Sequence, residues 1–161
     1  MQIKHCFLAT ILLLISMFSL ADIKPAMKKD SADISISGGS IRAMPPGQTT
    51  TAAFFTLNNN SNNALTLEKL SSNIAERVEI HSTEEHNGSL QMRKRDYIAI
   101  AAGETTVFAP GQDHIMFIGL KKPLKDGDNV DLNLCFGDFC KHLTLKAVSV
   151  LAESGHHHHH Q

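Results

Sequence analysis

The sequence predicts an all-β fold in a single domain, arranged as a sandwich or a barrel. Short runs of alternating apolar and polar residues recur along the chain, and clusters of Gly, Pro, Asn and Asp separate them. After the first 21 residues, no stretch shows the 3.6-residue period of an amphipathic helix. The chain has 161 residues, enough for one core and too few for two. We therefore expect one antiparallel domain over residues 33–150.

The expected strands follow one another closely. Each is rich in β-branched, aromatic or leucine side chains and ends near turn-forming residues. The clearest turn signal is the run of Asn and Ser at residues 58–63, which follows a strand ending at Leu57. The expected runs lie at residues 34–37, 51–57, 65–70, 77–81, 90–92, 97–100, 105–108, 115–118, 130–136 and 139–150.

The last two runs form a hairpin around Gly137-Asp138. Glycine at the first central position favours a type II′ turn, which places Cys135 opposite Cys140 at the second pair from the turn. This is a non-hydrogen-bonded pair, in which the Cβ atoms lie closest. We therefore expect a cross-strand disulfide between Cys135 and Cys140 that acts as a structural staple.

The first 21 residues indicate a cleaved secretory signal. A short polar start precedes an apolar run at residues 6–20, and the small residues Ser19 and Ala21 suit a signal peptidase. The run is short for a bilayer span, which needs about 20 apolar residues. We expect residues 22–32 to form a flexible leader and the mature protein to be exported, into a compartment where disulfides persist.

The composition argues against several classes of partner. The chain has 15 Lys and Arg against 16 Asp and Glu, without a charged block, so nothing indicates nucleic acid or a membrane surface. It has no Trp and one Tyr, Tyr97, which argues against an aromatic platform for sugars or single-stranded nucleic acid.

Two histidines and two methionines form a candidate metal site. His81 is followed by Met92 after ten intervening residues, by His114 after 21 more, and by Met116 two positions later. His114 and Met116 leave the same face of an expected strand, and the residues beside them point into the core. Imidazole and thioether are soft, uncharged ligands that suit Cu(I) better than Zn, Mg or Ca. A thioether also escapes the disulfide chemistry that removes thiols in an oxidising compartment.

These four side chains are expected at the rim of the domain. His81 ends its strand on the polar face, whereas Met92 alternates with Leu90 in a way that predicts drier surroundings. Two other histidines are placed outside the site: His86 in a polar loop at residues 83–89 and His142 on the surface of the last strand. Met44, which precedes Pro45-Pro46, either packs near the site or fills a turn.

The pattern His-x10-Met-x21-His-x-Met resembles the motif of the periplasmic copper chaperones of the PCuAC family. The resemblance implies a cupredoxin-like Greek-key β-sandwich in the periplasm that holds one Cu(I) through His81, Met92, His114 and Met116. It implies no catalysis, but delivery of copper to an apo acceptor, such as subunit II of cytochrome c oxidase or an intermediate thiol protein, for copper A centre assembly. A membrane would be reached only through that acceptor. The family motif often has Met after the first His, where this chain has Ser82.

The tail at residues 151–161 is either a native segment or a purification tag. If it is native, its adjacent imidazoles form a secondary Cu(II) site. These imidazoles belong to His156, His157, His158, His159 and His160.

Two other functions stay open for the domain: an exported protein-interaction module, and a copper redox enzyme. An electron-transfer copper site uses a Cys thiolate with two His ligands, and a Cys committed to the hairpin cannot supply that thiolate.

Overall fold

The computed structural model describes residues 33–149, which form ten β-strands and no helix. Each run expected from the sequence corresponds to one of these strands, and no helix in this stretch has the length and apolar character needed to cross a membrane. The strands are β1 (Ile34–Ala43), β2 (Thr50–Asn59), β3 (Leu65–Ser71), β4 (Ala75–His86), β5 (Ser89–Arg95), β6 (Ile98–Ile100), β7 (Thr105–Phe108), β8 (His114–Leu120), β9 (Asn129–Phe136) and β10 (Phe139–Ser149).

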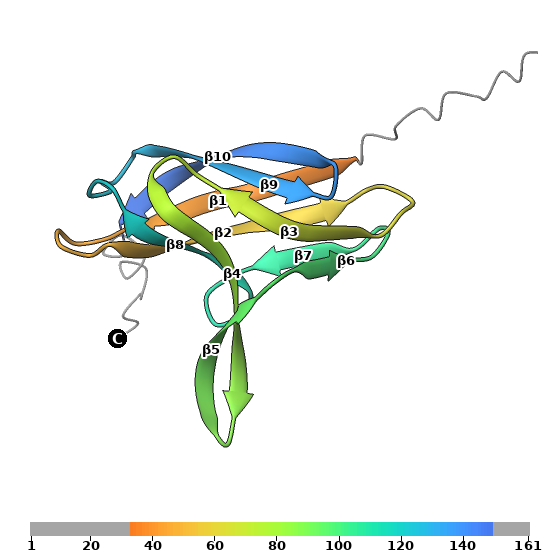
Figure 1. Cartoon of the computed structure of the whole chain (residues 1–161), viewed down its shortest axis with the longest axis horizontal. Coiled ribbons are helices and arrows are strands. Elements are labelled where there is room, and N and C mark those ends of the chain that lie inside the picture. The colour runs from red at the N-terminus through yellow and green to blue at the C-terminus, as the bar shows by residue number, and fades with distance from the viewer. Residues whose placement is uncertain (1–32, 150–161) are drawn as a thin grey trace, which may run out of the picture.

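All ten strands belong to one hydrogen-bonded sheet (Figure 1). Its order is β5-β4-β8-β2-β1-β10-β9-β3-β6, and β7 also pairs with β2. The all-β prediction is confirmed. The expectation of a purely antiparallel arrangement is wrong at one place, because β1 and β10 pair in parallel. This pair joins the two ends of the described chain, where no hairpin connection constrains the strand direction.

The core lies between the two halves of the folded sheet. Ile115 and Phe117 of β8 point inward as predicted and are fully buried, and they share one cluster with Leu132 and Leu134 of β9. Burying a side chain of this size contributes about 1.5–3 kcal/mol. Since alternate residues of a strand face opposite ways, the even-numbered residues of β8 lie on the outer face of the sheet.

The β4–β5 hairpin extends further than the sequence predicts. The predicted strand ends at His81 and places His86 in a loop, but β4 continues to His86 and turns at Asn87 and Gly88. The two turn residues have φ of 51° and 75°, and positive φ at both is what a type I′ turn requires. The hairpin therefore projects from the body of the molecule (Figure 1), and every residue of β5 is exposed.

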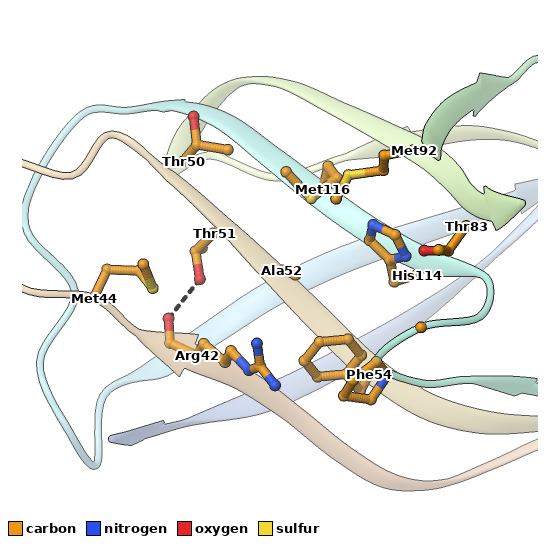
Figure 2. Close-up of a pocket in the computed structure, with 12 residues that line it drawn as sticks. Arg42, Met44, Thr50, Thr51, Ala52, Phe54, Thr83, Met92, His114 and Met116 are labelled. Carbon is orange, nitrogen blue, oxygen red and sulfur yellow. Dashed lines mark hydrogen bonds between the residues drawn. The ribbon is translucent and has the colours of Figure 1, made fainter. Parts of the chain in front are cut away.

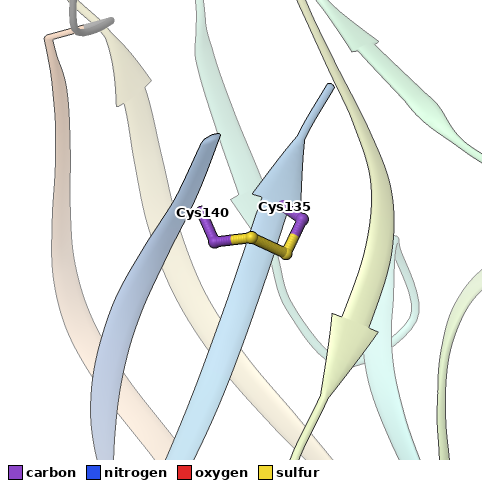
Figure 3. Close-up of a disulfide and its surroundings, with 2 residues drawn as sticks. All are labelled: Cys135 and Cys140. Atoms are coloured by element: carbon purple, nitrogen blue, oxygen red, sulfur yellow. A yellow bond between two sulfur atoms is a disulfide. The ribbon is translucent and has the colours of Figure 1, made fainter. Parts of the chain in front are cut away.

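The β9–β10 hairpin lies in the other half of the sheet. Gly137, at the first central position of its turn, has φ of 56°, and Cys135 and Cys140 are register partners. Their Sγ atoms form a disulfide that links the two strands, with the Cα atoms 4.0 Å apart (Figure 3).

Candidate metal centre

A pocket of about 270 Å³ lies on the outer face of the sheet, between β1, β2, β8 and the β4–β5 hairpin (Figure 2). Ala52 of β2 lines it and is the register partner of Met116 on β8. Because Ala52 carries only a methyl group, it leaves an open space between the longer side chains of the neighbouring strands. This space is where a ligand can reach the side chains of β8.

Three of the four predicted metal ligands line this pocket: Met92, His114 and Met116. His114 and Met116 share the outer face of β8, and Met92 reaches the pocket from β5, where it pairs with Thr83. In Figure 2 the side chain of Met92 points toward Met116. His114 is only 4% exposed, so the pocket has one buried nitrogen donor, beside Met92, Met116 and a third lining methionine, Met44.

The prediction that Met92 lies on the drier side is wrong, because it is 58% exposed. β5 is the edge strand of the sheet, and within residues 33–149 no strand other than β4 pairs with it. Alternation with Leu90 predicted dry surroundings, but Leu90 is exposed as well. Apolar residues on a projecting hairpin have no core to face.

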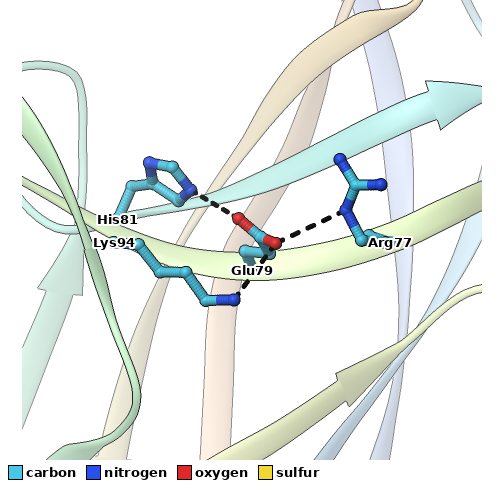
Figure 4. A network of polar contacts seen from close by, with 4 residues as sticks. All are labelled: Arg77, Glu79, His81 and Lys94. Atoms are coloured by element: carbon cyan, nitrogen blue, oxygen red, sulfur yellow. Dashed lines mark hydrogen bonds and ion pairs between the residues drawn. The ribbon is translucent and has the colours of Figure 1, made fainter.

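His81 lies beside the pocket and does not line it. It is the register partner of His114 across β4 and β8, and the two imidazole centroids are 6.1 Å apart. Its Nε2 lies 3.0 Å from Oε2 of Glu79 and donates to it, since an ionised carboxylate only accepts (Figure 4). Nδ1 of His81 then keeps the lone pair that can bind a metal.

The backbone fixes the tautomer of His114. Its Nδ1 lies 2.9 Å from the carbonyl oxygen of Gln112, and because a carbonyl only accepts, Nδ1 carries the proton. Nε2 is therefore the nitrogen that is free to bind a metal. The same carbonyl accepts a bond from the amide of Thr83, which ties the β4–β5 hairpin to the loop before β8.

Ser82 occupies the position that is often Met in the PCuAC motif. It alternates with His81 and is buried on the opposite side of β4, where its hydroxyl bonds the carboxylate of Asp113 and accepts from Nε of Arg95 at 3.0 Å. A side chain at this position faces away from the pocket. The departure from the motif therefore takes no sulfur from the pocket, which Met44, Met92 and Met116 line.

Glu79 is a part of the site that sequence reasoning missed. Besides His81, its carboxylate contacts Nζ of Lys94 at 3.2 Å and Nε of Arg77 at 3.6 Å (Figure 4). The hydrogen bond from His81 and the nearby Lys94 lower the pKa of Glu79, although partial burial opposes them. The available signal was its position two residues before His81, on the same face of the strand.

The side chains that gather at the pocket limit which metal ions it can bind. Between residues 33 and 149, no three His, Cys, Asp or Glu side chains gather in a way that could hold a metal ion. The donors that do gather are imidazoles and thioethers, the combination that favours Cu(I) over hard cations.

The fold and this donor set define a cupredoxin-like domain with an outward-facing His and Met pocket. The chain belongs to the LpqE-like family, since the family model described as "Putative lipoprotein LpqE-like" matches residues 34–148. It is 32% identical over 111 residues to "Putative lipoprotein Lxx21020" of Leifsonia xyli subsp. xyli (strain CTCB07), with 68% of this chain and 66% of that protein covered. It is 36% identical over 88 residues to "Uncharacterized protein RP573" of Rickettsia prowazekii (strain Madrid E), with 54% and 49% covered. The chain thus spans just under two thirds of the length of the Leifsonia protein and about half of the length of the Rickettsia protein.

Solved structures with the same fold include PCuAC domains. The Cu(I) form of DR1885 from Deinococcus radiodurans matches with a TM-score of 0.58 and 29% identity, covering 74% of this chain and 80% of that one. The copper-bound PCuAC domain from PmoF2 matches at 0.58 with 19% identity, covering 73% and 93%. The apo PCuAC domain from PmoF1 matches at 0.62 with 14% identity, covering 73% and 96%. The predicted resemblance to the PCuAC family and its cupredoxin-like fold is confirmed.

Proposed function

We propose that this protein is an exported copper chaperone that holds one Cu(I) through His81, Met92, His114 and Met116. It performs no catalysis and delivers the ion to an apo acceptor, such as oxidase subunit II or an intermediate thiol protein, for copper A centre assembly. The observation that carries the proposal is that Met92, His114 and Met116 line one pocket, with His81 beside His114. The solved structures of CuI-DR1885 and of the copper-bound PCuAC domain from PmoF2 support it.

His81 completes the ligand set through Nδ1. Its Nε2 keeps its proton and donates it in a hydrogen bond to Glu79, so the carboxylate orients the ring in the way that outer partners orient metal-binding histidines. Four neutral ligands leave the single charge of Cu(I) uncompensated, and the exposed Met92 gives an acceptor a point of attack. Such a site favours exchange over permanent retention.

The proposal is tested by anaerobic titration of Cu(I) against a competing chelator, with wild type, Met92→Ala/Met116→Ala and Leu90→Ala. Loss of both thioethers should weaken Cu(I) binding by at least about 100-fold, since even outer partners of a metal site are worth 10–100-fold. Leu90→Ala, on the same exposed strand, should bind like wild type. Equal affinity in the double variant and wild type would end the proposal.

Acid should release the copper. A protonated imidazole has no lone pair for a metal, so protons compete with Cu(I) for its histidine ligands. We therefore expect Cu(I) affinity to fall between pH 7 and pH 5, measured with a chelator whose own titration is corrected for. Affinity that stays flat over this range would contradict His ligation.

Export and the tail remain predictions, because the signal at residues 1–21, the leader at 22–32 and the histidines His156–His160 lie outside the described residues. The word lipoprotein in the family description supports export. Ser149, the last residue that the structure describes, pairs with Ala43 at the end of β1. Removal of the tail should abolish Cu(II) binding and leave Cu(I) binding intact.

A further inference from the structure

We propose that Arg42 is the docking residue for the acceptor, and that its guanidinium receives the acceptor's cysteine thiolate during copper transfer. The inference rests on the proposed function, and it adds that the acceptor group recognised at the pocket is negatively charged. Among the described residues that line the pocket, Arg42 is the only permanently charged side chain.

The register places Arg42 across the pocket from the thioether of Met116. Ile41 pairs with Ala53, so Arg42 falls opposite Ala52, whose partner on β8 is Met116. Neighbouring strands lie about 4.8 Å apart, so the backbones of Arg42 and Met116 are separated by roughly 10 Å. Ala52 stands between them with only a methyl group, and in Figure 2 the side chain of Arg42 runs from β1 toward Phe54.

Contacts with the protein hold Arg42 without neutralising it. Its guanidinium carbon lies 5.0 Å from the centroid of the Phe54 ring, a cation–π contact, and its carbonyl accepts a 2.6 Å bond from the hydroxyl of Thr51. Nε of Arg42 is buried without a hydrogen-bond partner, and within residues 33–149 the guanidinium forms no ion pair. The guanidinium of Arg42 is therefore fixed in position, and its positive charge is available to an incoming anion.

This charge has opposite effects on the two partners of the transfer. Cu(I) bound by neutral ligands is itself a cation, so Arg42 raises its energy in the pocket. A thiolate is attracted by both positive charges, and a neighbouring Arg also favours the thiolate over the thiol. The Arg42 side chain therefore lowers the affinity of the pocket for Cu(I) and stabilises the ternary complex of this protein, Cu(I) and the acceptor.

The transfer step is a ligand exchange without redox change. The acceptor thiol gives its proton to solvent, its sulfur forms a bond to Cu(I), and a bond from Cu(I) to one of the Met thioethers breaks. Copper stays Cu(I) throughout. The exposed thioether of Met92 is the first to leave, because solvent already reaches it.

The test compares a thiol with its methyl thioether on the Cu(I)-loaded full chain. The probes are 2-mercaptoethanol and 2-(methylthio)ethanol, and their dissociation constants are measured anaerobically for wild type, Arg42→Gln, Arg42→Lys and Arg93→Gln. Competition with neocuproine, a neutral chelator, measures the Cu(I) affinity of each variant when neither probe is present. Arg93, an exposed cation on β5 that pairs with Glu84, is the matched control.

Arg42→Gln should bind the thiol about fivefold or more weakly, within the usual range for coupling between two ligands, and should bind the thioether as wild type does. The same variant should hold Cu(I) more tightly when no probe is present. Arg42→Lys and Arg93→Gln should behave like wild type toward both probes. A merely structural role for Arg42 would instead weaken Cu(I) and both probes together.

Two results would overturn this inference: thiol binding that is the same in Arg42→Gln as in wild type, or thiol and thioether binding that fall together in this variant. In either case, Cu(I) binding by the wild-type protein would still support the chaperone proposal. Absence of Cu(I) binding in wild type would overturn both.

Discussion

At the scale of single residues, Glu79 shows how the fold orients His81, one of the proposed ligands. It accepts a hydrogen bond from His81 and is flanked by Lys94 and Arg77. These contacts hold the imidazole of His81 in one tautomer. They also hold the pKa of Glu79 below its ordinary value, so the folded protein favours the carboxylate.

Glu79 should therefore make the metal-free protein sensitive to acid. Because its pKa is lowered on folding, its contribution to stability is present above about pH 4.5 and is lost as the pH falls through the folded-state pKa. Glu79→Gln should cost about 1 kcal/mol at pH 7 and reduce the loss of unfolding free energy between pH 6 and pH 3.5. Urea denaturation at both pH values measures this, and an unchanged acid slope in the variant would contradict it.

Ala52 should matter because it is small. Ala52→Leu places three more carbon atoms in the pocket, and overpacking of that kind costs about 1–3 kcal/mol, or roughly tenfold in Cu(I) affinity. Because Ala52 is on the outer face, the free energy of unfolding should change by no more than about 0.5 kcal/mol. Chelator competition and urea denaturation test the two effects. Ala99→Leu, at an exposed position of β6, should change neither quantity.

At the scale of elements, β5 carries the proposed ligand Met92 without contributing to the core. All of β5 is exposed, and the position of Met92 depends on the register with β4, where it pairs with Thr83. The type I′ turn at Asn87 and Gly88 sets that register. The hairpin should therefore be separable from global stability.

Gly88→Val tests this separation. A β-branched residue at φ of 75° is strained by about 1–2 kcal/mol, which should open the hairpin and weaken Cu(I) binding about tenfold. Gly127→Val introduces the same strain at φ of 85° in the loop before β9, away from the pocket. It should lower the free energy of unfolding by a similar amount and keep wild-type Cu(I) affinity. Equal Cu(I) affinity in the two variants would show that the turn does not position Met92.

At the scale of the whole molecule, the two halves of the sheet have different tasks. The pocket is built from β1, β2, β4, β5 and β8, whereas the disulfide lies on β9 and β10. One continuous core joins the halves, so the disulfide half supports the fold without touching the pocket.

Cys135→Ser/Cys140→Ser should therefore reduce stability and leave metal binding alone. The bridged residues are five positions apart, and a loop this short predicts a loss of about 2 kcal/mol on the chain-entropy account. Thermal unfolding of the metal-free protein measures that loss, and chelator competition should give wild-type Cu(I) affinity. A loss of Cu(I) affinity would mean that the two halves are coupled.

Much of the fold could be predicted because its signals are local. Alternation along each run located the strands, and Gly137 located the last hairpin. The same alternation placed His114 and Met116 on the outer face of β8. It failed for Met92, because alternation tells which residues share a face but not whether another strand covers that face.

The sequence alone determined an all-β domain and a set of imidazole and thioether donors, since strand period and donor chemistry are properties of individual residues and their near neighbours. Only the tertiary structure decided that Glu79 orients His81, that Ala52 leaves the space for the pocket, and that Arg42 stands across it from Met116. The physical reason is register. Which side chains meet on the face of a sheet depends on pairing between strands far apart along the chain, and no local pattern specifies that pairing.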